Sequence, residues 1–375
     1  MATVIDHDHA HWTNGFRFTS SLADDVWHAD RGPGAYEWWY FDATSDDGRE
    51  TLVIIFFADF IFSPCFNRAA ARDGQGLNQD ARPAQFPALA CCLYRDGRPF
   101  VRAINEYKEA DFTASRTAPE CAIGASRFHF VRDGGDRTFQ LEIDEPLRGG
   151  RRLKGSFAWE VIEGDFDGAK RLSAAATQPA HEWNLVAPRC HVRGTYAVSR
   201  GKKVIESREF RGVGYHDHNY DARWLPAIVR QWQWGRAHFA DTTAVFYHYQ
   251  ELGAHAPVTY VFLTRGGALS ALPARVVAQG GRRHIFGLLY SRSLTFEFEH
   301  EGRAAALSVR QRKVVDGSYF YLRFIADAAL DLGDGRKRAA TAVTEHLAPR
   351  ALRWRGLDWL TDMRIGRGGR GSFLP

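Results

Sequence analysis

Apolar and polar residues alternate with a period of two over many short segments of the chain. The clearest examples are residues 138–144 (TFQLEID), 157–161 (FAWEV) and 294–302 (LTFEFEHEG). Successive side chains of a strand point to opposite faces of a sheet, so this period predicts strands with one buried face.

Glycine-rich turn clusters separate these segments. They have the spacing that an antiparallel meander needs. Only residues 349–365 and 67–78 have room for a helix, and residues 221–229 interrupt the strand pattern. We therefore predict an all-β chain of sandwich or barrel type. The turn clusters lie at residues 95–98, 132–137, 148–152, 265–267 and 331–336.

The length of 375 residues exceeds the size at which one hydrophobic core usually suffices. The most loop-like interior stretch is residues 164–179, and the interruption of the strands near 220–228 marks the expected boundary. We predict an N-terminal extension at 1–30, an N-terminal β domain at 31–225, and a C-terminal β domain with a basic tail at 226–375. No repeat of fixed period is visible.

Composition refines this picture. A hydrophobic content of 45% and a charged content of 25% are typical of a soluble globular protein, and 26 phenylalanines and 11 tryptophans favour strands and aromatic-lined surfaces. Five cysteines, an odd number with no C-x-x-C pair, argue against a disulfide framework and a zinc knuckle. We expect buried thiols.

No targeting or membrane-spanning segment is expected. The first twenty residues lack a basic start followed by an apolar run, so they do not resemble a signal peptide. The longest apolar run, residues 52–62, contains Asp59 and is too short to span a bilayer. We expect a cytoplasmic protein.

The net charge of +5 is unevenly distributed, because residues 350–375 contain six arginines against Asp358 and Asp362. The segment also contains Trp359 and Phe373. Two interpretations remain: a solvated segment covering a barrel end, which we prefer, and a peripheral contact with an anionic inner membrane. No recognised motif or long basic stripe accompanies it, so we expect no nucleic-acid partner.

The segment GYHDHNYD at residues 214–221 is the densest polar cluster. If it is extended, His216 and His218 share one face and Asp217 the other. A metal interpretation would add His238 or His248, but the spacing is a weak signal and no carboxylate motif completes the set, so we predict no metal. The similar DHDHAH at 6–11 is expected to be an exposed tail.

An acid/base interpretation centres on Asp217. To donate a proton near neutral pH its pKa must rise from about 3.9, and burial against aromatic walls can raise it by roughly 3–5 units. Residues 230–250 offer such walls, with Trp232 and Trp234 on one strand face. The structural alternative is a hydrogen-bonded turn at a barrel end. We favour function, because so many polar groups are costly to bury without use.

Several stretches resemble one family. Taken in order from about residue 30 to 365, they are similar to the carotenoid 1,2-hydratases, also called hydroxyneurosporene synthases, which belong with lipocalin-like proteins that include fungal Diels-Alderases. The most specific stretches are the YEWWYFDA block, the Gly214–Asn219 segment and the Trp-x-Trp that follows. The full set is residues 35–64, 181–196, 211–221, 230–250, 341–352 and 357–367.

The resemblance implies two lipocalin-like antiparallel β-barrels or sandwiches packed together, with a ligand cavity at their junction. It implies a lyase without a metal or organic cofactor, acting on a hydrophobic isoprenoid or polyene. The acid that protonates the double bond would be Asp217, and Trp232 with Trp234 would match the family's Trp-x-Trp. The two histidines beside Asp217, and His248, depart from the family pattern and leave an imidazole-based acid/base site open.

We predict catalytic roles for Asp217, His216, His218 and Tyr215. Glu37 is expected either to orient the acid or to hold water, while Trp38 to Tyr40 have the structural alternative of cementing the first strand. The residues predicted to bind substrate are Trp38, Glu37, Trp232, Trp234, Tyr247, His248, Phe246 and Asn219.

Three functional hypotheses follow. The first is a hydratase, isomerase or cyclase that uses Asp217 as the acid. The second is a lipocalin-like carrier that binds a hydrophobic ligand without changing it. The third is a pericyclase whose cavity folds a polyene and polarises a carbonyl group.

Overall fold

The computed structural model describes residues 15–29, 32, 34–73, 84–166 and 180–375. Four predictions fall wholly or partly outside these residues: the N-terminal extension at 1–30, the tail at 6–11, the end of the helix expected at 67–78, and most of the loop expected at 164–179.

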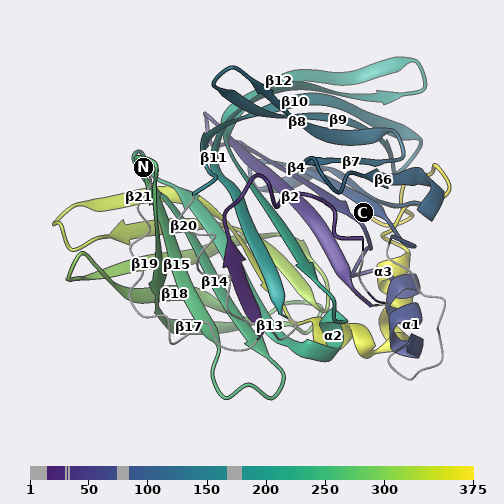
Figure 1. Cartoon of the computed structure of the whole chain (residues 1–375). Coiled ribbons are helices and arrows are strands. Elements are labelled where there is room, and N and C mark those ends of the chain that lie inside the picture. The colour runs from purple at the N-terminus through teal and green to yellow at the C-terminus, as the bar shows by residue number, and fades with distance from the viewer. Residues whose placement is uncertain (1–14, 30–31, 33, 74–83, 167–179) are drawn as a thin grey trace. The chain divides into compact units, whose positions relative to one another are not determined.

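Two antiparallel sheets make up most of the described chain (Figure 1). This confirms the predicted all-β architecture, and the turn clusters at 95–98, 132–137 and 148–152 each join two neighbouring strands. The first sheet contains β1 (Phe16–Thr19), β2 (Tyr36–Ser45), β3 (Glu50–Phe57), β4 (Ala88–Arg95), β5 (Arg98–Glu106), β6 (Phe112–Ala114), β7 (Glu120–Ile123), β8 (Ser126–Asp133), β9 (Asp136–Leu147), β10 (Arg151–Glu163), β11 (His181–Arg200) and β12 (Lys203–Asp221).

The strands of the first sheet run in the order β5-β4-β3-β2-β12-β11-β10-β9-β8-β7-β6, with β1 beside β11. Two meanders therefore meet where β12 returns to pair with β2. The sheet curls, so that Asn105 of the edge strand β5 donates a hydrogen bond to Glu145 of β9. The strands β2, β12 and β11 lie at its centre, and they contain most of the candidate site.

The second sheet has the order β16-β15-β14-β13-β21-β20-β19-β18-β17. The turns at 265–267 and 331–336 lie where the sequence places them. Its strands are β13 (Val229–His238), β14 (Thr243–Glu251), β15 (Val258–Arg265), β16 (Ala268–Pro273), β17 (Arg275–Arg283), β18 (Leu289–His300), β19 (Arg303–Gly317), β20 (Tyr321–Asp331) and β21 (Lys337–Leu347).

The chain forms two compact units, one around each sheet. The N-terminal unit comprises Phe18–Asp165, Pro179–Leu225 and Trp354–Pro375, and the C-terminal unit is built on Pro226–Arg353. These units differ from the predicted domains at the C-terminus, since the basic tail belongs to the N-terminal unit. The physical reason is pairing: Gly366 bridges to Asn105 of β5, and Arg367 forms an ion pair with Glu106.

Helices are short among the described residues. α1 spans Pro64–Asp73 and α2 spans Leu225–Ile228, where the sequence shows the interruption. The single helix expected at 349–365 is wrong: this segment contains two 3-10 turns, Pro349–Arg353 and Arg355–Leu357, followed by α3 (Asp358–Asp362). A third such turn covers Glu109–Asp111.

Each unit has its own hydrophobic core. In the N-terminal unit the core includes Trp39 and Phe41 of β2 but neither Trp38 nor Tyr40, which lie on the opposite face of that strand. Four of the five cysteines are buried, and all five are free thiols, as predicted; burial raises the pKa of Cys91.

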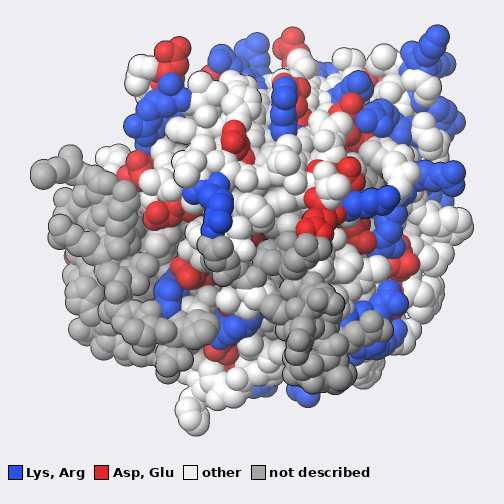
Figure 2. Space-filling view, turned by 45° about the vertical axis from the view of Figure 1, so that its right-hand side comes forward, with Lys and Arg blue, Asp and Glu red and all other residues white. Residues whose placement is uncertain are grey.

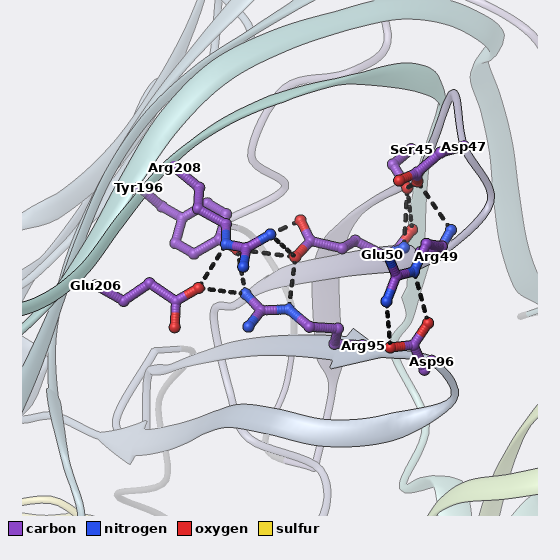
Figure 3. A network of polar contacts seen from close by, with 9 residues as sticks. All are labelled: Ser45, Asp47, Arg49, Glu50, Arg95, Asp96, Tyr196, Glu206 and Arg208. Carbon is purple, nitrogen blue, oxygen red and sulfur yellow. Dashed lines mark hydrogen bonds and ion pairs between the residues drawn. The ribbon is translucent and has the colours of Figure 1, made fainter.

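A polar network ties the ends of several strands of the N-terminal unit together (Figure 3). Arg95 bonds Glu50 at 2.8 Å and Glu206 at 2.7 Å, and it also donates to the Tyr196 hydroxyl. The network joins β3 and β4 to the long hairpin of β11 and β12, which fixes the course of the strand that bears the polar cluster.

Charges are interspersed on the face that Figure 2 shows, where acidic and basic side chains of the described residues alternate among uncharged ones. Among the described residues, none of the helices has the length and apolar character needed to cross a membrane.

Candidate active site

Strand β12 carries the polar cluster through the centre of the N-terminal sheet, between β2 and β11. Asp217 lies opposite Tyr40 of β2, and His218 lies opposite Trp39. The segment is extended, so its side chains alternate as the sequence predicts. Both faces of the strand are buried, and each carries a separate set of polar contacts.

On one face, three donors converge on the carboxylate of Asp217. The indole N–H of Trp183 donates to Oδ2 at 2.9 Å, and the Tyr215 hydroxyl donates to the same oxygen at 2.6 Å. The Asn219 amide donates to Oδ1 at 2.8 Å. Tyr215 and Asn219 reach the carboxylate because residues two apart on a strand share a face, and Trp183 reaches it from β11.

Aromatic rings of β2 lie on the same face as this carboxylate. Tyr36 stacks on Trp38 with ring centroids 5.2 Å apart, and Tyr40 packs edge-on against Tyr215 at 6.1 Å. Across the pairing of β2 with β12, Tyr40 lies opposite Asp217, Trp38 opposite Asn219 and Tyr36 opposite Asp221. A carboxylate held by oriented donors beside electron-rich rings can move a proton to or from an apolar molecule and stabilise a cation next to it.

His181 of β11 extends the same face. Its Nδ1 lies 2.9 Å from the Tyr36 hydroxyl. Burial, and to a smaller extent the charge of Arg223, lowers the pKa of His181 to about 3. The imidazole is therefore neutral at neutral pH.

On the opposite face of β12, His216 and His218 lie in the core of the unit. Nε2 of His216 is 3.0 Å from Oδ2 of Asp25, and Nε2 of His218 is 2.9 Å from Oε1 of Glu37. His216 stacks on Phe41 with ring centroids 3.8 Å apart. This face therefore holds the histidines away from Asp217.

The charged groups on this second face shift one another's pKa values. Burial disfavours the imidazolium of His218, but contacts with Asp25 and Glu37 outweigh it and raise its pKa to about 9. Burial likewise opposes ionisation of Glu37, yet hydrogen bonds from His218 and His28 lower its pKa to about 2. At neutral pH these groups form buried ion pairs.

The remaining residues predicted to bind substrate belong to the C-terminal unit. Trp232 and Trp234 of β13 share a face with Tyr247 of β14, and the rings of Trp232 and Tyr247 are 5.3 Å apart. Phe246 and His248 lie on the other face of β14. Phe246 stacks on Phe296 in the hydrophobic core, with centroids 4.4 Å apart. Trp232, Trp234 and Tyr247 therefore face one side of the sheet, while Phe246 and His248 face the other, so the two groups cannot line the same side of one cavity.

His248 is held by hydroxyl and amide groups. Its Nδ1 lies 2.8 Å from the Thr259 hydroxyl, and its Nε2 lies 3.3 Å from the side-chain nitrogen of Gln231. Burial lowers its pKa to about 4, so it is neutral at neutral pH.

Sequence reasoning missed Trp183, His181, Asp25 and His28. The first two carried a usable signal, because His181 and Trp183 are two apart in a strand and fall in a stretch that supports the family resemblance. Asp25 and His28 lie outside regular strands, where no periodicity exists to reveal them.

Comparison with known proteins identifies related chains. A family model described as "Carotenoid hydratase CrtC" matches residues 54–372. Hydroxyneurosporene dehydrogenase of Chlorobaculum tepidum is 26% identical over 370 residues, which are 95% of this chain and 94% of that protein.

A second relative is the acyclic carotenoid 1,2-hydratase of Rubrivivax gelatinosus. It is 32% identical over 232 residues, which are 57% of this chain. The match spans 48% of that hydratase, so this chain is similar to about half of its length.

Two solved structures have the same lipocalin-like fold. CghA in complex with Sch210972 superposes with a TM-score of 0.55 and 12% identity, covering 88% of this chain and 94% of CghA. An AttH-type protein of Nitrosomonas europaea superposes with a TM-score of 0.57 and 12% identity, covering 87% of this chain and 95% of that one. These likenesses bear on the fold alone.

Proposed function

Because this chain belongs to the carotenoid hydratase family, it is a hydratase-like enzyme, and we propose that it adds water to a terminal C=C bond of an acyclic polyene. The family matches most of the chain, and one relative is an acyclic carotenoid 1,2-hydratase. The observation that carries the proposal is the carboxylate of Asp217, which accepts hydrogen bonds from Trp183, Tyr215 and Asn219.

The proposed reaction begins with proton transfer from the carboxyl group of Asp217 to the less substituted carbon of a trisubstituted double bond. A tertiary cation forms on the neighbouring carbon. A water molecule adds its oxygen to that cation, and one of its protons returns to Asp217. The enzyme is restored, and the product is heavier by one water.

The three donors serve the first step. They stabilise the negative charge that Asp217 gains when it releases its proton, and they hold the carboxyl group in one orientation. Aromatic rings on the same face, Tyr36, Trp38 and Tyr40, can stabilise the cation by roughly 0.5–2 kcal/mol for each well-placed ring. No step in this scheme needs a cofactor.

The roles predicted for His216, His218 and Glu37 change. Their side chains lie on the face opposite Asp217, where His218 forms buried ion pairs with Glu37 and Asp25, and His216 contacts Asp25. We therefore assign them to holding β12 in place. Trp232, Trp234 and Tyr247 share one aromatic face of the C-terminal unit, and their binding of substrate stays a prediction. We exclude Phe246, which packs in the core of that unit.

The test is incubation of the full chain with an acyclic carotenoid in D2O, followed by mass spectrometry. The expected product has gained the elements of D2O and keeps one deuterium on carbon. Asp217→Asn should abolish turnover while the fold and ligand affinity are retained. The matched control is Glu209→Gln, which changes an exposed carboxylate of the same strand and should remain fully active.

Other outcomes contradict the proposal. An unchanged ligand after long incubation would indicate a carrier. A product of unchanged mass with an altered absorption spectrum would indicate an isomerase or cyclase. Full activity of Asp217→Asn would exclude Asp217 as the acid.

A further inference from the structure

Three side chains on the face opposite Asp217 bring their ligand atoms together. Nδ1 of His28 lies 2.8 Å from Oε1 of Glu37, and Nε2 of His218 lies 2.9 Å from the same oxygen. The three atoms all lie within 4.8 Å of one another. They come from the segment before β2, from β2 and from β12, and the proposed hydration does not use them.

The spacing of these atoms suits a transition metal. Imidazole nitrogens and carboxylate oxygens bind zinc at about 2.0–2.2 Å, so two ligands at tetrahedral or octahedral angles lie roughly 2.9–3.5 Å apart. The distance from Glu37 to His218 lies at the lower limit of this range, and the distance from Glu37 to His28 falls just below it.

The contact behind His218 supports the same conclusion. A histidine that binds a metal usually turns its other ring nitrogen toward a carboxylate, which orients the ring. Nδ1 of His218 faces Oδ1 of Asp25 at 3.2 Å, and the other oxygen of Asp25 contacts His216 at 3.0 Å. Both Nδ1 and Oδ1 are buried and make no hydrogen bond of good geometry.

The rings are fixed in place, and one is accessible. His218 stacks on Trp39 with ring centroids 4.7 Å apart, and His28 stacks on Tyr220 at 4.0 Å. His28 is 27% exposed, while Glu37 and His218 are buried. An ion could therefore enter past His28, and little side-chain freedom remains to be lost when it binds.

We propose that His28, Glu37 and His218 form a binding site for a divalent transition metal such as zinc, which fastens the segment before β2 to strands β2 and β12. The site lies on the face of β12 away from Asp217. This inference does not rest on the proposed hydration, since a metal-binding clamp could serve any activity of the fold.

The test is calorimetric titration of zinc into the full chain after treatment with a chelator. We expect one equivalent to bind, with release of the proton that His218 carries at neutral pH, together with an increase in the melting temperature. His28→Gln can still donate a hydrogen bond to Glu37 but supplies no imidazole, so it should fold normally and bind zinc at least tenfold more weakly. Circular dichroism checks the fold of each variant.

The control is His129→Ala, which removes another half-buried histidine of the same unit. It should bind zinc as the unaltered chain does. The proposal is overturned if the unaltered chain binds no zinc, or if the two histidine variants lose zinc equally, which would indicate binding at scattered surface histidines. Neither readout depends on hydratase activity.

Discussion

Neighbouring residues of β12 enter different chemical environments. Asp217 accepts hydrogen bonds from Trp183, Tyr215 and Asn219, whereas His216 and His218 contact Asp25 and Glu37 on the other face. A shift of one residue in the register of this strand would exchange the two sets. The identity of the acid is therefore a matter of register as much as of residue type.

Trp183 is expected to contribute to catalysis through its indole N–H group, which donates to Asp217. Trp183→Phe keeps an aromatic ring but removes the donor to Asp217, and loss of one such donor typically lowers kcat by about 100-fold. KM should change little, because the ring remains. Steady-state kinetics on the carotenoid substrate would measure both constants.

The control for this variant is Trp159→Phe. It also removes an indole N–H, which donates to the backbone carbonyl of Asp42 at 3.3 Å but does not reach Asp217. If both variants lowered kcat equally per folded molecule, the effect would be general loosening of the sheet, and the assigned role of Trp183 would be incorrect.

Glu145 provides a pH-dependent contribution to stability. Burial raises its pKa to about 7, although Asn105, Ser126 and Tyr107 donate hydrogen bonds to it. The folded chain therefore binds a proton that the unfolded chain releases near its ordinary pKa of 4.5. Stability should fall as pH rises from 4.5 through 7, by about 3 kcal/mol in total.

Glu145→Gln should remove this dependence. As pH rises from about 5 to about 8, the unaltered chain should lose more unfolding free energy than the variant does. Urea denaturation of both chains at each pH would measure the difference. Burial also raises the pKa of Asp59 to about 7, and this group adds the same pH dependence of stability to both chains. If the unfolding free energies of the two chains changed equally with pH, the prediction would be wrong.

At the scale of elements, the close pairing of β12 with its neighbours depends on Gly214. A Cβ atom at this position would lie 2.5 Å from Nε1 of Trp159 and 2.9 Å from the Asp42 carbonyl oxygen, and it would also collide with Val192. The absence of a side chain at Gly214 therefore leaves room for the residues of β2, β10 and β11 that pack against β12 at the start of the polar cluster.

Gly214→Ala should destabilise the chain by about 1–3 kcal/mol, since overpacking of a dense core has this cost. Thermal or urea denaturation would measure it. Gly135→Ala is the matched control, because a Cβ there meets nothing within 4 Å, and its stability should be unchanged. Equal stability of the two variants would show that the sheet relaxes around position 214.

At the scale of the whole molecule, the end of the N-terminal unit exposes large apolar groups. Trp354 is 72% exposed, Trp359 is 56% exposed and Phe373 is 71% exposed. Arg355 and Arg370 are exposed in the same segment, whereas Arg367 pairs with Glu106 and Asp362. Tryptophan with arginine is typical of a surface that touches an anionic membrane.

We expect the chain to sediment with vesicles of phosphatidylglycerol and phosphatidylcholine, and less so as salt increases. The double variant Trp354→Ser with Trp359→Ser should reduce the bound fraction severalfold. Ile285→Ser, which alters an exposed apolar residue of the C-terminal unit, is the control and should bind normally. Equal loss in both would contradict a contact specific to the tail.

The sequence by itself determined the features that are local. Alternation predicts the strands, glycine-rich clusters predict the turns, and the same alternation separates Asp217 from His216 and His218. The ordered stretches also identify the family correctly. The strands, the turns and the separation of Asp217 from the histidines follow from the geometry of neighbouring residues, which needs no knowledge of distant partners, whereas the family follows from the resemblance of its stretches.

Only the tertiary structure decided which distant residues meet Asp217. The sequence favours Trp232 and Trp234, which follow soon after it, but their strand belongs to the other sheet; the indole that contacts Asp217 is Trp183, from β11. Asp25 and His28 likewise reach the histidines from outside regular strands. Pairing across a sheet is set by long-range packing and register, which a period of two leaves undetermined.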